Sequence, residues 1–188
     1  MTNLTKTNSM LSKFAFALLA MACFSIGSAQ AASKEKIDRR VDNALNEFRT
    51  EVSGANSVLS RAKGVLVFPS VKKAGFGVGG EYGEGALRIN GKSVAYYNTA
   101  SASIGFQIGA QVRRQILVFL DEGALEKFRS SAGWEIGVDA SVTVVTVDVG
   151  GSIDATQINQ PIVAFIFDGK GLMYNLSLEG SKVSPIHD

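Results

Sequence analysis

Side chains that could carry out catalysis are few in this sequence of 188 residues, and they form no familiar catalytic constellation. His187 is the single histidine and lies one residue from the end, which argues against a histidine-based triad and against a multi-histidine metal site. The acidic residues are scattered without the spacing of metal ligands, and solvation at the surface explains them most simply. The candidates among them are Glu81, Glu84, Asp139, Asp148, Asp154 and Asp168. We therefore predict no enzyme, no cofactor and no metal site; the alternative is a hydrolase of envelope polymers that uses two of these carboxylates.

A glycine-rich segment offers a second kind of chemistry, because Gly75–Gly80 matches the pattern G-x-G-x-x-G. In a dinucleotide site such glycines let a pyrophosphate approach backbone N–H groups at the start of a helix. Here no apolar strand directly precedes the segment, and residues 81–85 are poor at starting a helix. We therefore predict that no nucleotide binds. The glycines are expected to leave one face of a strand bare, so that a neighbouring element or an acyl chain can pack on it.

Clustered basic residues are the remaining candidates for ligand contact. The predicted lipid-binding residues are Lys36, Arg39, Arg40, Lys72, Lys73, Arg113 and Arg114. The pairs at 72–73 and 113–114 bracket the glycine-rich segment and are the preferred contacts for a lipid headgroup. Residues 36, 39 and 40 are expected to matter less, because acids of the same helix offset their charge.

The N-terminal residues predict export from the cytoplasm. Lys6 and Lys13 form a basic head, residues 14–24 are apolar, and Ala29-Gln-Ala31 matches a signal-peptidase exit. The apolar run is too short to cross a hydrocarbon core of about 30 Å comfortably. We therefore predict a signal peptide over residues 1–31, a single domain over residues 32–188 and a periplasmic location. The alternative is a lipoprotein acylated at Cys23.

Removing the signal changes the charge balance. Lys6 and Lys13 are two of the 19 Lys and Arg residues, so 17 basic residues then face 17 acidic ones. The chain without its signal therefore has no general attraction for nucleic acid, and we predict no nucleic-acid partner. It would also lack cysteine, which excludes disulfides and thiol chemistry. Any attraction to an anionic surface must come from local clusters of basic residues.

One amphipathic helix and many strands are predicted to position these residues. The apolar residues between Lys36 and Val52 fall within an arc of roughly 100°, which indicates a helix with a buried stripe. Gly54 is expected to end it, and Asn56-Ser57 to cap a short turn that runs to Lys63. A second short helix is expected near residues 121–130, where acids stand in the first turn.

The rest of the sequence predicts strands joined mainly by tight turns. Residues 65–68 form an apolar run that Pro69 is expected to stop, and Asn90-Gly91 is typical of a hairpin turn. Residues 100–112 and 134–144 each alternate apolar and polar side chains, and each predicts a half-buried strand. Residues 162–167 and 172–178 are expected to form a closing hairpin. The predicted fold class is α+β, with a mainly antiparallel, strongly curved or barrel-like sheet.

Several segments together resemble the SYLF lipid-binding domain family. The similar segments lie at Ala62–Ser70, Lys73–Gly80, Tyr82–Gly85, Ser103–Gln111 and Leu176–Lys182. The resemblance spans nearly all of residues 37–186 and implies a single domain that binds lipids. It further implies that eukaryotic relatives bind phosphoinositides and that some fungal relatives bind actin filaments.

The sequence thus predicts a non-enzymatic lipid-binding module of the bacterial cell envelope. It is expected to contact anionic phospholipid, or a membrane surface, through local basic residues and an apolar surface. A structural or stress protein that binds other envelope proteins is a further alternative, with partners that the sequence does not name.

Overall fold

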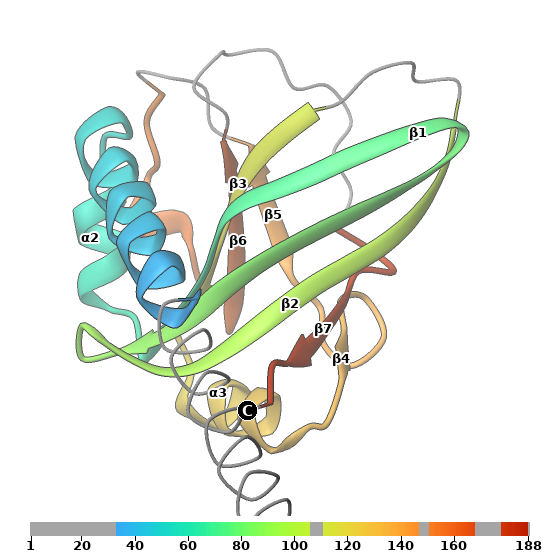
Figure 1. Ribbon diagram of the computed structural model, residues 1–188. Coiled ribbons are helices and arrows are strands. Elements are labelled where there is room, and N and C mark those ends of the chain that lie inside the picture. Colours follow the sequence, from blue (N-terminus) through green and yellow to red (C-terminus); the bar gives the residue numbers. More distant parts are fainter. Residues whose placement is uncertain (1–32, 106–110, 147–150, 168–177, 188) are drawn as a thin grey trace, which may run out of the picture. The chain divides into compact units, whose positions relative to one another are not determined.

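The computed structural model describes residues 33–105, 111–146, 151–167 and 178–187 (Figure 1). The chain divides into two compact units, one of residues 1–36 with residue 188 and one of residues 37–187. Within the first unit the structure describes only residues 33–36, which are helical. The predicted signal peptide and Cys23 lie outside the described residues. The account below concerns the second unit.

The helices lie close to their predicted positions. The N-terminal helix covers residues 33–51, against a prediction of 36–52. Helix α2 spans Ala55–Ser60, and its N-cap is Gly54, with φ 85°, so the predicted cap at Asn56 is wrong. Helix α3 spans Glu122–Ser130, and the Asp121 carboxylate accepts a hydrogen bond from the Ala124 N–H at 2.8 Å. A 3-10 turn, η1, covers Ala155–Gln157.

Seven strands form one sheet in the described part of the chain. They are β1 Gly64–Ile89, β2 Lys92–Gly105, β3 Gln111–Phe119, β4 Trp134–Glu135, β5 Thr143–Thr146, β6 Ile162–Phe167 and β7 Lys182–Pro185. Their order is β4-β7-β2-β1-β3-β6-β5, and every described pairing is antiparallel except β5 with β6. The sheet is curled, so the predicted α+β class with a mainly antiparallel, curved sheet is confirmed.

Strand β1 turns back on itself within its 26 residues. Lys73 and Glu81 are eight positions apart, and an extended strand would separate them by about 26 Å. Their side chains nevertheless lie 3.7 Å apart. The first arm of β1 pairs with β3 and the second arm pairs with β2, and Figure 1 shows the ribbon reversing at its far tip.

Two glycines permit the close approach of the arms of β1. A Cβ at Gly83 would lie 2.9 Å from the Ser70 carbonyl oxygen, and one at Gly85 would overlap the Val67 carbonyl oxygen. Packing of a neighbouring element on glycine, which the sequence predicted for the Gly75–Gly80 segment, therefore occurs at these two later glycines. Gly75–Gly80 itself lies inside β1 and does not begin a helix, so the predicted failure of the dinucleotide context is confirmed.

Three strand predictions need correction. Pro69 does not end the strand, because β1 continues through it with a register irregularity between Phe68 and Val71. Residues 100–105 belong to β2 and residues 111–112 to β3, and each of these strands pairs with a different arm of β1. Residues 134–144 are interrupted after β4, where Gly137 has φ 89° and the chain turns. Residues 168–177, which hold most of the predicted closing hairpin, lie outside the described residues.

The sheet has an outer and an inner face, each with its own core. On the outer face, buried residues of the N-terminal helix and α2 pack on alternate strand residues such as Ala86, Ile116 and Phe165. On the inner face, α3 and Trp134 pack on the other alternate set, which includes Leu87, Leu117 and Phe119. The predicted amphipathic helix is therefore confirmed as a core element, with Phe48 fully buried.

Candidate functional site

A charged cluster lies on the inner face where β1 turns back. Arg113 of β3 donates two hydrogen bonds to the Glu81 carboxylate, at 3.3 and 2.5 Å, and Lys73 reaches the same carboxylate at 3.7 Å. The side chains of Arg113 and Glu81 are only 7% and 8% exposed. Burial lowers the pKa of Arg113, and the nearby Glu81 charge opposes that effect. One carboxylate thus joins both arms of β1 to β3.

The cluster changes the expected roles of two predicted residues. Arg113 was predicted to contact a headgroup at the surface, whereas the structure buries it against Glu81. The reason is strand alternation, because Arg113 and Glu81 both point to the inner face of the curled sheet. Lys73 also faces Glu81 and is about one quarter exposed. These two cations therefore hold the strands together.

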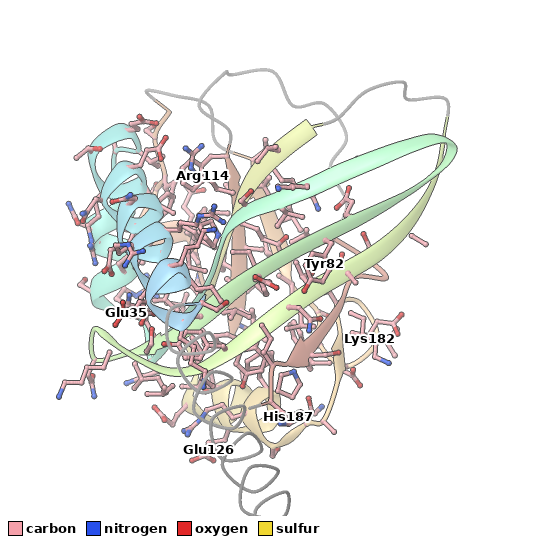
Figure 2. All side chains as sticks on the ribbon, viewed as in Figure 1. Glu35, Tyr82, Arg114, Glu126, Lys182 and His187 are labelled. Carbon is pink, nitrogen blue, oxygen red and sulfur yellow. The ribbon has the colours of Figure 1, made fainter. Side chains whose placement is uncertain are left out.

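The second arginine of the same pair points to the outer face. Arg114 lies beside the N-terminal helix (Figure 2), where it forms an ion pair with Glu47 at 2.9 Å. Its guanidinium also stands 5.6 Å from the centre of the Phe167 ring. Arg114 therefore joins the helix to the sheet at the border of the helix-covered region. The sequence predicted Arg114 as a headgroup contact and did not identify Glu47 as its partner.

The predicted basic residues of the N-terminal helix are exposed. Arg39 and Arg40 stand on the solvent side of the helix, opposite its buried stripe, and Lys36, which belongs to the first unit, is exposed. Arg39 also interacts with another residue. The apolar side of the helix is occupied by the outer core, with Val41 and Phe48 completely buried. This helix therefore presents only its mixed-charge side to solvent.

Lys72 differs from the other predicted strand residues. Its side chain is exposed, and it makes no ion pair with any residue that the structure describes. It is paired across the ladder with Val112, which is 53% exposed. Residues directly opposite in an antiparallel pair share one face of the sheet, so Lys72 and Val112 lie together on the outer face.

Further apolar residues extend this exposed surface on β1 and β2. Tyr82 is 51% exposed and lies opposite the exposed Ala100, while Gly80 lies opposite the exposed Ala102. Figure 2 shows Tyr82 on the β1–β2 hairpin, away from the N-terminal helix. We call Lys72, Tyr82, Ala100, Ala102 and Val112 the open patch.

The open patch continues the same outer face that the helices cover elsewhere. Ala86, four residues further along β1 from Tyr82, is completely buried beneath the helices, and so is Ile116, four residues along β3 from Val112. The alternation of residues 100–112 was expected to bury its apolar side. The structure instead exposes Ala100, Ala102 and Val112, because no described helix extends over this part of the sheet.

Glu84 introduces one negative charge beside the open patch. The Tyr82 hydroxyl donates a hydrogen bond to the Glu84 carboxylate at 3.0 Å. Burial, followed by that hydrogen bond and the charge of Glu84, raises the pKa of Tyr82. The phenol therefore stays neutral and keeps its polar tip at the margin of an apolar surface, an arrangement suited to a membrane–water boundary.

The acidic residues proposed as a catalytic pair have structural roles wherever they are described. Glu81 holds Arg113 and Lys73, and the Asp139 carboxylate accepts from the Glu135 N–H at 2.6 Å. Asp154 accepts from the Thr156 N–H at 3.0 Å and starts η1. Asp148 and Asp168 lie outside the described residues. No group of three potential metal-binding side chains occurs among the residues that the structure describes.

None of the described helices has both the length and the apolar character needed to cross a bilayer.

The sequence alone could not locate the open patch, for an identifiable reason. The alternation of residues 100–112 indicates which side chains share a face of the strand, but not which face a helix will cover. In β1 the adjacent residues Glu81 and Tyr82 point to opposite faces, and the structure buries the acid and exposes the aromatic residue, the reverse of the usual arrangement.

Comparison with known protein families identifies a family for part of the chain. The model of the Ysc84 family, described as Las17-binding protein actin regulator, matches residues 100–188. The resemblance to the SYLF family is thereby confirmed over these residues. The family is associated with lipid or actin binding and is generally non-catalytic. A comparison with curated proteins finds no significant match.

Proposed function

We propose that this protein is a lipid-binding module of the bacterial cell envelope and that it contacts anionic phospholipid through the open patch. The observation that carries the proposal is the uncovered part of the outer face. There the exposed Val112 lies opposite Lys72 in the β1–β3 ladder, the exposed Tyr82 lies opposite Ala100 in the β1–β2 ladder, and the charge of Lys72 has no acidic partner among the described residues. The family match supports lipid as the ligand class.

The physical basis is a weak electrostatic attraction combined with apolar contact. A Lys near an anionic bilayer contributes about 1 kcal/mol, and this contribution fades within a Debye length. Tyr82 and Val112 add apolar surface that leaves water on contact, and a tyrosine suits the headgroup region. Because Glu84 opposes Lys72, binding is expected to be modest and to weaken as salt concentration rises.

The envelope location rests on the sequence. A basic head, a short apolar run and the Ala29-Gln-Ala31 exit support export through a cleaved signal peptide. Acylation of Cys23 is the alternative, and it would anchor the same domain to a membrane.

Sedimentation with vesicles tests the contact surface. Protein expressed from the full sequence should pellet with phosphatidylglycerol vesicles and pellet poorly with phosphatidylcholine vesicles. Lys72→Gln should weaken binding about fivefold, which corresponds to about 1 kcal/mol. Glu84→Gln should strengthen it by a similar factor, because it removes a repelling charge from the rim of the open patch.

Two controls separate the open patch from other basic surfaces. Lys127→Gln removes an exposed lysine from α3 and should leave binding unchanged. The triple change Lys36→Gln, Arg39→Gln and Arg40→Gln should have less effect than Lys72→Gln with Tyr82→Ser. The proposal is wrong if the helix changes abolish binding while the open-patch changes do nothing.

A further inference from the structure

A second candidate site lies on the opposite side of the helix-covered region, in a groove of about 440 Å³. The N-terminal helix, the end of α2 with the residues that follow it, the start of β1 and the β1–β2 turn form its walls. A volume of this size lies within the range of about 300–1,000 Å³ that small-molecule sites occupy. No residue of the open patch lines the groove.

One side of the groove is apolar. Leu45 and Val65 belong to the buried outer core, and Leu59 and Ala62 pack against that core while remaining partly accessible. A ligand in the groove would therefore meet a wall of aliphatic side chains. This wall would accept a short apolar group at little cost, because its side chains are already fixed by core packing.

The polar side of the groove is basic. Arg49, Lys63 and Arg88 line it together with a single acid, Asp42. Arg88 is held in place by Asp42 at 2.7 Å and by the Gly91 carbonyl at 3.1 Å, with Asp38 at 3.6 Å behind it. The carboxylates of Asp42 and Asp38 thus offset part of the positive charge of the three basic residues. The positive charge that they leave is carried by Arg49 and Lys63.

Arg49 and Lys63 are available to a ligand. Both are exposed, and neither forms an ion pair with a residue that the structure describes. The side-chain hydrogen bond found for Arg49 is a long one of 3.4 Å to Asn46. The groove therefore offers N–H donors of Arg49 and Lys63 to an anionic acceptor.

We propose that this groove binds a phosphate ester that carries a short apolar group. Arg49 and Lys63 hold the phosphate through charge-assisted hydrogen bonds, Arg88 fixes the geometry of the basic side, and the aliphatic wall takes the organic part. The ester is either the headgroup end of a lipid or a soluble organic phosphate. The site is independent of the open patch, so each can fail without the other.

Calorimetric titration tests the groove with three probes. These are inorganic phosphate, glycerol 3-phosphate and dihexanoyl phosphatidic acid below its micelle concentration, each added to protein expressed from the full sequence. The esters should bind more tightly than inorganic phosphate. If the acyl chains add affinity over glycerol 3-phosphate, the source is a lipid; equal affinity of the two esters identifies a soluble phosphate.

Matched variants locate the binding. Arg49→Gln with Lys63→Gln should weaken ester binding at least tenfold, because the double variant removes both charge-assisted hydrogen bonds to the phosphate. Lys127→Gln with Arg129→Gln removes the same two residue types from exposed positions of α3 and should change nothing. Ser60→Trp, which fills the groove without altering its charge, should abolish ester binding.

Three results would overturn the proposal. The first is that no ester binds at millimolar concentration. The second is that inorganic phosphate binds as tightly as the esters. The third is that the groove variants bind as well as the unmodified protein. All groove variants should still pellet with phosphatidylglycerol vesicles, so a failure here is distinguishable from a failure of the open patch.

Discussion

At the scale of single residues, one carboxylate organises the turned-back strand. Glu81 accepts hydrogen bonds from Arg113 and faces Lys73, so three strand segments that are distant in sequence meet at a buried charge. The sequence indicated that both basic pairs bracket the glycine-rich segment, but it did not show that one member of each pair turns inward to the same acid. Pairing across a sheet depends on register, which a single sequence does not specify.

Removing one partner of this buried pair should be costly. Arg113→Gln leaves the Glu81 carboxylate with a weaker partner in a site where both side chains are under 10% exposed. Breaking such a pair typically costs about 3–5 kcal/mol of unfolding free energy. Urea denaturation followed by circular dichroism measures the loss. Arg114→Gln is the matched control, because its pair with Glu47 is about 30% exposed and contributes at most about 1 kcal/mol. Equal losses in the two variants would contradict the account.

At the scale of elements, the sequence predicted helices better than strands. The helical stripe from Ile37 to Phe48 packs in the core as its periodicity indicated, and Asp121 starts α3 beside the predicted acids. Within the alternating segment, residues 100–105 belong to β2 and residues 111–112 to β3, and its described apolar side chains at Ala100, Ala102 and Val112 are exposed. Helix periodicity reports a local property, whereas the burial of a sheet face depends on which distant element packs on it.

The reversal of β1 depends on glycine at specific positions. Gly85→Ala should destabilise the protein by about 1–3 kcal/mol or more, because the new methyl group would overlap the Val67 carbonyl oxygen of the opposite arm. Gly80→Ala is the matched control in the same strand, since the nearest atom to its added Cβ is 3.7 Å away. Thermal unfolding should show a clear drop in Tm for the first variant and little change for the second. Similar melting temperatures for both would show that the arms do not depend on this contact.

At the scale of the whole molecule, the proposed export sets the charge with which the domain would meet lipid. If residues 1–31 are removed as proposed, acidic and basic residues balance, so long-range attraction to an anionic membrane is small. Contact must then depend on local features such as the open patch, where one lysine adjoins apolar side chains. The composition predicted that contact depends on local features. Only the structure shows where the apolar surface is exposed.

Export predicts a defined N-terminus. Cleavage after Ala31 should give a chain that begins at Ala32, as the Ala29-Gln-Ala31 exit indicates. The intact mass of protein recovered from the native cells measures this directly. A diacylated species that begins at Cys23 would replace the periplasmic location with a lipid-anchored one.

The central claim is that the open patch, and not the N-terminal helix, meets the membrane. The most direct measurement places an environment-sensitive fluorophore on single cysteines at Tyr82, Val112, Arg40 and Lys127, each in a Cys23→Ser background. With phosphatidylglycerol vesicles, we expect the probes at 82 and 112 to shift to shorter emission wavelengths and to be quenched by spin-labelled lipid. Probes at 40 and 127 should stay in an aqueous environment. A shifted and quenched probe at 40 with unchanged probes at 82 and 112 would contradict the account and assign membrane contact to the helix.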